Sequence, residues 1–441
     1  MLPENVKERL SKHMLVDGLD VIVDLENSKG SWLVDRRNND RYLDFFSMFA
    51  SMAVGFNHPK LVAAKERFGK LAIQKPANSD AYTIAMAEFV DTFARIGIPE
   101  HLPYAFFIEG GSAAVENALK TAFDWKVRKN FSKGKKRVIG SKIIHFKQAF
   151  HGRTGYTLSL TNTSDPRKTQ YFPTFNWPRI LNPKLYFPIT EENLKRTIKH
   201  EKIAVKQIRE AITNHGEEIA GLIIEPIQGE GGDNHFRKEF FKTLRQICDE
   251  NEIMFIMDEV QTGIGLTGKF WAYEHTGIAP DIICFGKKSQ VCGILVSRRI
   301  DEIDHHVFKE SSRINSTFGG NLIDMIRFTY ILNIINDNNL LENARIQGDL
   351  LLSDLQKIAG KYPDVISNPR GCGLMCAFDL PDGKKRDLFR KTLFREGVLV
   401  LGCGKKSIRF RPHLIVTEDE IHYGMDIISK VLKDQGSSLK K

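Results

Sequence analysis

The fold is decided by two short runs of sequence, IMFIMDE at residues 253–259 and DIICFGK at residues 281–287. Each contains consecutive apolar residues, with the length and composition of a strand that is buried on both faces. Each also ends on a residue that carries chemistry, because Asp258 closes the first run and Lys287 closes the second. Ligands of open α/β sheets lie outside the carboxyl ends of the strands. The two side chains are therefore predicted to meet at one site.

Further runs of the same kind lie on either side. Residues 104–108 precede a Gly-Gly loop, and residues 222–224 end at Glu225. Up to about residue 318, such runs alternate with helical patterns, which predicts a mostly parallel sheet in an α/β fold. From residue 321 onward come long helical patterns, a strand around residues 407–410, and a last helix that opens with a capping box, Thr417-x-x-Glu420. This part is predicted to form a second, smaller α+β domain.

Composition excludes several classes of protein. The chain has 441 residues, of which 42% are hydrophobic and 27% charged, a balance typical of globular proteins. Its apolar stretches are far shorter than the roughly 20 residues that a membrane helix needs, so no membrane partner is expected. The polar N-terminus lacks a secretory signal. Six scattered cysteines without a CxxC pair predict reduced thiols, no metal site and a cytoplasmic location.

The chain is basic, with 64 Lys and Arg against 54 Asp and Glu and a net charge of +10. Part of this excess is local, because residues 120–147 hold ten basic residues and one acid, Asp124. Neither an aromatic platform nor helix-turn-helix spacing accompanies these charges. We therefore interpret the segment as a solvated helix face and loop, and expect no nucleic-acid partner.

A glycine-rich segment, GIGLTGK at residues 263–269, matches two nucleotide-binding patterns. A phosphate-binding P-loop needs Ser or Thr after the lysine, but Phe270 stands there. A dinucleotide fingerprint should follow its strand directly, and residues 258–262 intervene. A glycine-rich turn is the favoured interpretation, and a nucleotide-binding protein stays as an alternative.

Lys287 and Asp258 suit a particular chemistry. A desolvated lysine has a lowered pKa and can act as an amine nucleophile that forms a Schiff base. A nearby carboxylate can keep a pyridine nitrogen protonated, as the electron sink of pyridoxal phosphate requires. The phosphate of such a cofactor needs backbone donors at a helix start, and Gly111 and Ser112 lie where a strand, a glycine loop and a helix follow one another.

With these motifs, the chain resembles the class III aminotransferases of fold type I. The similarity rests on residues 258–263 and 281–287 and extends from about Gly30 to Arg409. Within that family it is most similar to the L-lysine 6-aminotransferases, on residues 149–162, 286–293 and 315–321. The resemblance implies a large domain with a mostly parallel seven-stranded sheet, and a small α+β domain built from both termini. The implied divisions are residues 1–56 and 319–441 for the small domain and 57–318 for the cofactor-binding domain.

The resemblance also implies roles for residues around a pyridoxal 5'-phosphate cofactor. Lys287 would carry the cofactor as a Schiff base, and its spacing of six from Asp281 selects it over Lys288. Adjacent side chains of an extended segment point apart, so only one lysine can face the ring. Asp258 would bind the pyridine nitrogen, and Gln261 the ring hydroxyl.

The remaining cofactor contacts follow from the same resemblance. Phe150 would stack on one face of the ring, and Val260 would pack on the other. Gly111 and Ser112 would hold the phosphate through the helix start. Thr317 would reach the phosphate of the other subunit, which requires a homodimer with shared active sites.

On the substrate side, the resemblance points to Arg153, Glu230 and Arg409. Arg153 would hold the α-carboxylate of L-lysine, or the distal carboxylate of 2-oxoglutarate, since arginine forks suit carboxylates. Arg409 would bind the α-carboxylate of the keto acid. Glu230 would mask Arg409 while lysine is bound, and the glycines beside it suit such a movement.

The implied activity is an L-lysine 6-transaminase with ping-pong kinetics. It would move the ε-amino group of lysine to 2-oxoglutarate, giving 2-aminoadipate 6-semialdehyde, which cyclises to piperideine-6-carboxylate, and L-glutamate. Two alternatives stay open beside nucleotide binding. One is another class III ω-aminotransferase, acting on ornithine or 4-aminobutyrate. The other is a catalytically silent protein that binds the same cofactor.

Overall fold

The centre of the molecule is a seven-stranded sheet. The structure is a computed structural model in which residues 1–439 are described. The strand order is β3-β9-β8-β7-β6-β4-β5. The bounds are Tyr104–Ile108 (β3), Lys142–Phe146 (β4), Arg179–Ile180 (β5), Ile219–Ile224 (β6), Met254–Asp258 (β7), Ile282–Phe285 (β8) and Cys292–Val296 (β9). The runs predicted around residues 104–108, 222–224, 253–257 and 281–285 are all strands of this sheet.

One strand breaks the parallel pattern. Strands β8, β7, β6, β4 and β5 pair in parallel, whereas β9 is antiparallel to both of its neighbours, β3 and β8. Because β9 returns directly after the turn that carries Lys287, it holds the end of β8 in place. The predicted mostly parallel, seven-stranded sheet is confirmed.

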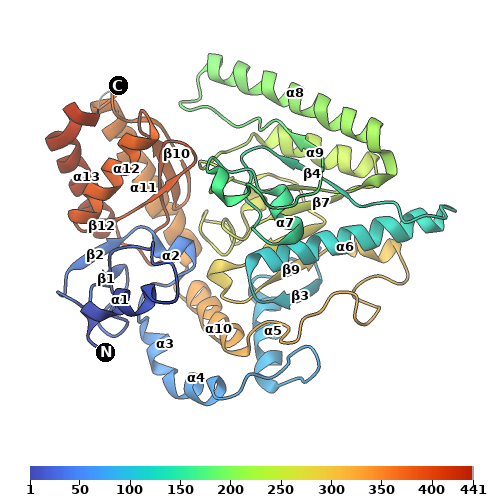
Figure 1. Ribbon diagram of the computed structural model, residues 1–441, viewed down its shortest axis with the longest axis horizontal. Helices are drawn as coiled ribbons and strands as arrows, with labels where there is room; N and C mark the ends of the chain where they lie inside the picture. The colour runs from blue at the N-terminus through green and yellow to red at the C-terminus, as the bar shows by residue number, and fades with distance from the viewer. Residues whose placement is uncertain (440–441) are drawn as a thin grey trace.

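The sheet is buried on both faces, as its apolar strands predict. Along β7, Met254 and Ile256 belong to one core cluster and Phe255 and Met257 to the other. Helix α6 (Gly111–Ser132) covers the first face, and α9 (Lys238–Glu250) packs on the second (Figure 1). Other helices of this part are α3 (Pro59–Ala63), α4 (Lys65–Ala72), α5 (Ile84–Ile96), α7 (Gly155–Leu160) and α8 (Glu191–His215).

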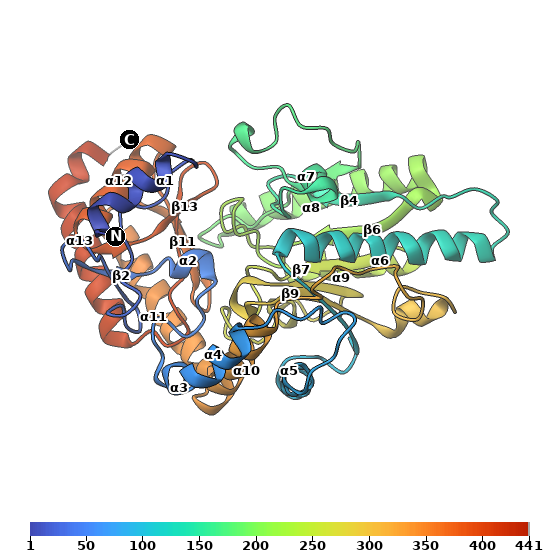
Figure 2. The same cartoon turned by 60° about the horizontal axis from the view of Figure 1, so that its bottom comes forward.

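The two ends of the chain build a second lobe together. Strand β2 (Arg41–Asp44) pairs antiparallel with β1 (Trp32–Val34) and parallel with β12 (Val398–Leu399), so residues from both ends share one sheet. A four-stranded antiparallel sheet has the order β10-β11-β14-β13. Its strands are Ser367–Cys372 (β10), Met375–Asp379 (β11), Leu401–Cys403 (β13) and Ser407–Phe410 (β14). Figures 1 and 2 place both chain ends in this lobe, as the smaller α+β domain requires.

Helices complete the second lobe and join it to the first. They are α1 (Val6–Ser11), α2 (Ser47–Ala50), α10 (Leu322–Asp337), α11 (Leu340–Lys361), α12 (Gly383–Arg395) and α13 (Glu418–Leu439). Thr417 and Glu420 form the predicted capping box at the start of α13. Helix α10 packs on α4 and α5 of the first lobe and also on α11. The division at residue 318 stays a prediction.

The basic segment 120–147 covers the end of α6, a loop and strand β4. Lys126 is buried on α6, where its Nζ donates to the carbonyl of Glu252 at 2.9 Å, and burial lowers its pKa to about 8. Further along, Lys135 pairs with Glu217 at 2.8 Å. Several other basic side chains of the segment pair with acids of neighbouring segments, whereas the buried Lys126 departs from the solvated helix face inferred from the sequence.

The glycine-rich segment and the absence of long apolar stretches can also be compared with the structure. Residues 263–268 form turns, with Ile264, Gly265 and Gly268 all at positive φ, and they do not cap a helix. Among residues 1–439, no helix combines the length and the apolarity needed to cross a membrane.

Candidate active site

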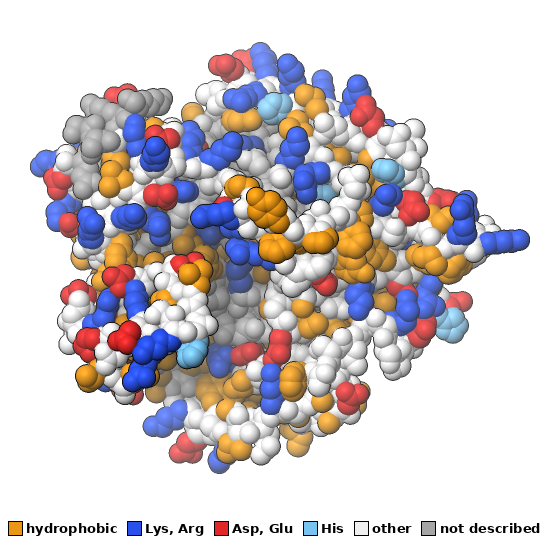
Figure 3. Space-filling model, viewed as in Figure 1, with side chains coloured by type: hydrophobic (Ala, Val, Ile, Leu, Met, Phe, Trp, Pro, Cys, Tyr) orange, Lys and Arg blue, Asp and Glu red, His pale blue; other side chains and the backbone are white. Residues whose placement is uncertain are grey.

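A cavity of about 210 Å³ opens where β7 and β8 end and α6 begins. It is lined by Gly111, Ser112, Phe150, His151, Gly152, Glu225, Asp258, Val260, Gln261 and Lys287. Seven of these were singled out from the sequence; His151, Gly152 and Glu225 were not assigned to the site. Figure 3 shows the molecule hollowed between its two lobes, with Lys and Arg side chains gathered around the hollow.

Lys287 reaches this cavity from a constrained turn. After β8 ends at Phe285, Lys287 adopts φ 55°, in the left-handed region that a non-glycine residue rarely occupies. Its side chain keeps some access to the cavity, yet the surrounding protein desolvates it and lowers the pKa of its ammonium group. A lysine with a lowered pKa has a larger neutral fraction, which is the nucleophilic form.

Lys288 points elsewhere. Its Nζ is buried and donates to the carbonyl of Gln261 at 2.8 Å and to that of Ala50 at 3.4 Å. Burial also lowers the pKa of Lys288, but its contacts are backbone carbonyls and it does not line the cavity. Of the two lysines, only Lys287 is placed to react with a ligand there.

Asp258 is held by a histidine that sequence reasoning missed. The Nδ1 atom of His151 lies 2.8 Å from Oδ2 of Asp258, and the other carboxylate oxygen accepts from the N–H of Val260 at 3.0 Å. Both side chains are buried. An unprotonated Nδ1 would place a lone pair against a carboxylate, so Nδ1 is assigned as the protonated nitrogen. The pair fixes one orientation of the carboxylate at the cavity wall.

Glu225 is the second buried acid of the cavity. Its oxygens accept from the N–H groups of Phe150 and Gly229, each at 3.0 Å. Burial raises the pKa of Glu225 to about 7, against the opposing effect of His151 and of these two bonds. Glu225 therefore ties the loop that carries Phe150 to the loop that begins at Gly229.

The start of α6 forms an open cradle. Gly110 adopts φ 92°, no side chain caps the helix, and its first turn contains no acid. A Cβ atom on Gly111 would lie 3.0 Å from Val260, and one on Gly152 would lie 2.2 Å from Oγ of Ser112. The backbone can therefore approach a ligand closely here. Free N–H groups at a helix start bind phosphate oxygens well.

Gln261 faces two arginines. Its Oε1 accepts from Nη1 of Arg409 at 3.1 Å and from Nη2 of Arg411 at 2.9 Å. Arg411 is buried and forms a two-pronged ion pair with Asp233. The contact of Gln261 with a ring hydroxyl stays a prediction, and the Nε2 group of the amide would make it.

Four other predicted residues lie outside the lining of the cavity. Arg153 is exposed, with its guanidinium carbon 6.0 Å from the centre of the Phe150 ring. Thr317 is exposed, and its carbonyl accepts from Oγ of Ser79 at 3.2 Å. Arg409 is buried behind Gln261, and Glu230 forms an ion pair with Lys168.

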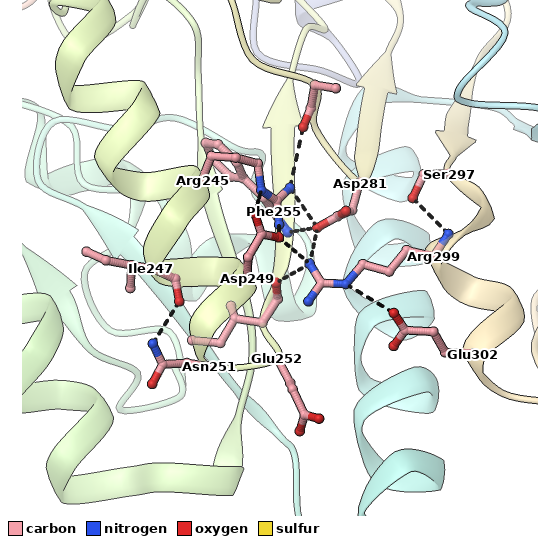
Figure 4. A network of polar contacts seen from close by, with 12 residues as sticks. Arg245, Ile247, Asp249, Asn251, Glu252, Phe255, Asp281, Ser297, Arg299 and Glu302 are labelled. Atoms are coloured by element: carbon pink, nitrogen blue, oxygen red, sulfur yellow. Dashed lines mark hydrogen bonds and ion pairs between the residues drawn. The ribbon is translucent and has the colours of Figure 1, made fainter.

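Asp281, the aspartate of the second motif, directly precedes β8, so it lies at the opposite end of this strand from Lys287. Figure 4 shows the polar contacts of Asp281. Its Oδ2 accepts from the N–H of Phe255 at 2.7 Å and from Arg245 and Arg299, each at 3.0 Å. The spacing of six between Asp281 and Lys287 is therefore the length of one strand, with a structural residue at one end and a candidate reactive residue at the other.

Comparison with known proteins agrees with this geometry. The family described as class III aminotransferase matches residues 15–432, and the chain belongs to this family. An L-lysine-epsilon aminotransferase of Mycobacterium tuberculosis is 48% identical over 433 residues, which cover 98% of this chain and 96% of that protein. That of Amycolatopsis lactamdurans is 45% identical over 436 residues, with the same two coverages. The human mitochondrial 4-aminobutyrate aminotransferase is 34% identical, covering 93% of this chain and 84% of that protein.

Solved structures give the same result. A lysine aminotransferase from M. tuberculosis superposes with a TM-score of 0.96 at 47% identity, covering 98% of this chain and all of that one. An omega transaminase from Pseudomonas jessenii, at 22% identity and a TM-score of 0.85, supports the fold alone. The fold and the aminotransferase class inferred from the sequence are confirmed.

Proposed function

We propose that this aminotransferase transfers the ε-amino group of L-lysine to 2-oxoglutarate, with pyridoxal 5'-phosphate as its cofactor. The products are 2-aminoadipate 6-semialdehyde, which cyclises to piperideine-6-carboxylate, and L-glutamate. The observation that carries the proposal is the 44–48% identity, over nearly the whole chain, to proteins named L-lysine-epsilon aminotransferase. Identity to the 4-aminobutyrate enzyme is 34%.

The cavity fits this cofactor. The open start of α6 at Gly111 and Ser112 suits a phosphate group. Asp258, oriented by His151, suits a protonated ring nitrogen, and Lys287 offers a desolvated amine. When bound, pyridoxal phosphate supplies a conjugated electron sink for charge that develops on the substrate carbon.

The chain's own residues position the substrate and move the proton. Arg153, exposed beside Phe150, binds the α-carboxylate of lysine, so that the long side chain directs its ε-amine inward. Nζ of Lys287, once free, would take a proton from the carbon that bears the ε-amine and would deliver it to the cofactor rather than back to that carbon. The lowered pKa of Lys287, caused mainly by burial, enlarges the fraction of its basic form. Phe150 and Val260 are apolar residues of the cavity lining and limit the entry of water.

The second half of the reaction uses the same pocket. Arg153 binds the distal carboxylate of 2-oxoglutarate, and Arg409 binds its α-carboxylate. In the lysine half, Glu230 covers Arg409, so that an amino acid is not bound in the reverse orientation. The two half-reactions alternate in one site, which predicts ping-pong kinetics.

The assembly and the location are parts of the same proposal. A groove of about 990 Å³ is lined by apolar and polar residues of the segments 78–107 and 298–319, and Tyr82 in it is 83% exposed. We infer that a second copy of the chain covers this groove and brings Thr317 to its partner's cofactor. The six cysteines are free, which suits a reducing cytoplasm.

A half-reaction tests the proposal. The purified protein, loaded with pyridoxal phosphate, is mixed with L-lysine, L-ornithine or 4-aminobutyrate without a keto acid, and the cofactor absorbance is followed. Lysine should react fastest and give the cyclised 6-semialdehyde. Faster reaction with ornithine or 4-aminobutyrate would assign the enzyme to that substrate instead. Reaction with none of the three amines would favour a silent binding protein.

A further inference from the structure

Three loops meet around Glu230. The N–H of Gly404 donates to the carbonyl of Glu230 at 2.8 Å, and the carbonyl of Gly404 accepts from Oγ of Ser164 at 3.1 Å. Ser164 leads into a single 3-10 turn, Pro166–Lys168. These contacts hold Lys168 beside Glu230, and its Nζ lies 2.5 Å from Oε1 of that carboxylate.

The Lys168–Glu230 pair is largely withdrawn from water. The two side chains are only 22% and 19% exposed. Ion pairs of this burial are screened less than surface pairs, and their partners are harder to replace with water. Glu230 is therefore held by a specific cation, and that cation is not the arginine which the sequence resemblance assigned to it.

Arg409, unlike Glu230, has no partner of opposite charge among residues 1–439. Its guanidinium is buried, and burial lowers its pKa. Within residues 1–439 it has no ion pair within 4 Å, its hydrogen bond goes to the neutral amide of Gln261, and its Nε has no partner. The Oε2 atom of Glu230 is likewise buried without a partner. A buried cation without a counter-ion is unfavourable, which leaves Arg409 ready to accept a carboxylate.

Glu230 lies within electrostatic reach of Arg409. Its charge raises the pKa of the Arg409 guanidinium against the larger effect of burial. The carboxylate thus lies between two cations: Lys168, which forms an ion pair with it, and Arg409, which does not. The backbone on either side of Glu230 is closely packed, since a Cβ atom would lie 2.2 Å from Gln261 at Gly229 and 2.0 Å from Gln148 at Gly231, so the carboxylate changes partner by movement of its side chain.

We propose that Lys168 is a positioning residue which docks Glu230 away from Arg409 and thereby opens Arg409 to the α-carboxylate of the keto acid. This inference rests on the proposed function, in which Arg409 must be covered for lysine and uncovered for 2-oxoglutarate. The structure corresponds to the uncovered arrangement. Lys168 sets the equilibrium between the covered and uncovered arrangements of Arg409. The apparent affinity of Arg409 for a dicarboxylate scales with the fraction of molecules in which it is uncovered.

Removing Lys168 should close the site to the keto acid. In Lys168→Met, Glu230 loses its docking cation and moves to Arg409, so the KM for 2-oxoglutarate should rise about tenfold while kcat changes little. The lysine half-reaction should keep its rate or improve. Lys168→Arg keeps the positive charge and should restore the KM.

Binding measured without turnover separates this effect from catalysis. Glutarate has both carboxylates of the keto acid but no carbonyl to react. Its dissociation constant for the loaded enzyme, measured by calorimetry, should rise about tenfold in Lys168→Met. Arg167→Ala is the matched control, because Arg167 is on the same turn but 81% exposed and paired with Asp165. It should leave glutarate binding unchanged.

A double-mutant cycle decides between positioning and direct binding. In a Glu230→Ala background there is no carboxylate to dock, so Lys168→Met should have no effect on glutarate binding. An equal loss in both backgrounds would overturn the proposal, because Lys168 would then attract the ligand directly. So would unchanged glutarate binding in Lys168→Met alone. Failure of the lysine half-reaction with intact Lys168 would instead refute the proposed function, independently of these binding results.

Discussion

Lys287 and Lys288 are neighbours with opposite surroundings. Lys287 lines the cavity, whereas Lys288 is bound to two backbone carbonyls. Lys287→Ala should lower kcat by on the order of 10⁴-fold or more, because the group that moves the proton is lost. Lys288→Met keeps most of the side-chain volume and should retain turnover. Single-turnover kinetics with lysine, on variants whose folding is checked by thermal unfolding, measure both effects.

The reverse result would be decisive. If Lys288→Met were inactive and Lys287→Ala active, the reacting lysine would be the other one. A bound cofactor in Lys287→Ala, detected by its absorbance, would show that the cradle at α6 and Asp258 hold the ring without the lysine.

At the residue scale, strand ends were predictable and long-range partners were not. Asp258 and Lys287 follow apolar runs, and the sequence placed them together correctly. His151 lies 107 positions from Asp258, and no spacing rule connects them. Arg411 could have been found, since it is two residues after Arg409 in an extended segment and alternate residues share a face. The docking of Glu230 on Lys168 depends on three loops, whose conformations leave no periodic pattern.

At the scale of elements, Asp281 connects the two central strands β7 and β8 near their amino ends, away from the cavity. It bonds the N–H of Phe255 on β7 and two arginines, one from α9 and one after β9 (Figure 4). Asp281→Ala leaves two partly buried guanidinium groups without this partner and should cost about 3 kcal/mol of unfolding free energy. Urea unfolding measures this cost. Turnover of the folded fraction at low temperature should change little, and a large loss there would give Asp281 a role in the chemistry.

The type of each element was easier to predict than its direction. Residues 254–258 and 282–285 are strands because both faces are buried, which their apolar sequence predicts. Strand β9 was not singled out from the sequence, although Cys292–Val296 is apolar. Its antiparallel direction could not be predicted, because that direction depends on the turn that begins at Lys287. The capping box at Thr417 was predictable since it is purely local.

For the whole molecule, stability should depend on pH through the buried His145. Its Nε2 accepts from Nε of Arg179 at 3.1 Å and its Nδ1 bonds the carbonyl of Ile143 at 3.3 Å, so the ring is neutral. Burial, with the Arg179 charge, lowers the pKa of His145 to about 3. The unfolded chain, with an ordinary histidine pKa near 6.5, takes up a proton as pH falls below about 6.5, whereas the folded protein does not. The stabilisation is therefore complete above 6.5 and lost progressively towards pH 3.

The variant His145→Gln removes this titration and can still accept from Arg179. Between pH 7.5 and 5.5, wild-type protein should lose on the order of 1 kcal/mol more than the variant. Urea unfolding of both proteins at the two pH values gives the difference, from which contributions of all other groups cancel. Parallel losses in the two proteins would mean that His145 takes up its proton at the same pH in the folded protein as in the unfolded chain.

The two-lobed shape was predictable only through family resemblance. Spacing alone does not reveal that β2 pairs with β12, which is more than 350 residues away. Pairing between the ends of a chain carries no local signal, whereas four strands of the main sheet, β3, β6, β7 and β8, are visible in the sequence as apolar runs. The division of the chain at residues 56 and 318 stays a prediction for the same reason.

Assembly is the last property at this scale, and shared active sites make it testable. In the proposed homodimer, a site takes Lys287 from one subunit and Thr317 from the other. Thr317→Glu would repel the cofactor phosphate, and Lys287→Ala would remove the reacting amine, so each homodimer should be nearly inactive. Subunits with different tags, co-expressed and purified as hybrids, would place both lesions in one of the two sites. The other site would be intact.

An equal, randomly assembled mixture of the two chains should therefore recover about a quarter of wild-type activity, because half of the dimers are hybrids and each has one working site. The matched control combines Lys287→Ala with Asp258→Ala. Those residues belong to the site of one subunit, so every site in that hybrid carries a lesion and no activity should return. Hybrids of Lys287→Ala and Thr317→Glu that stay inactive would remove Thr317 from its partner's site. A sedimentation mass of 50.2 kDa, that of a single chain, would refute the dimer itself.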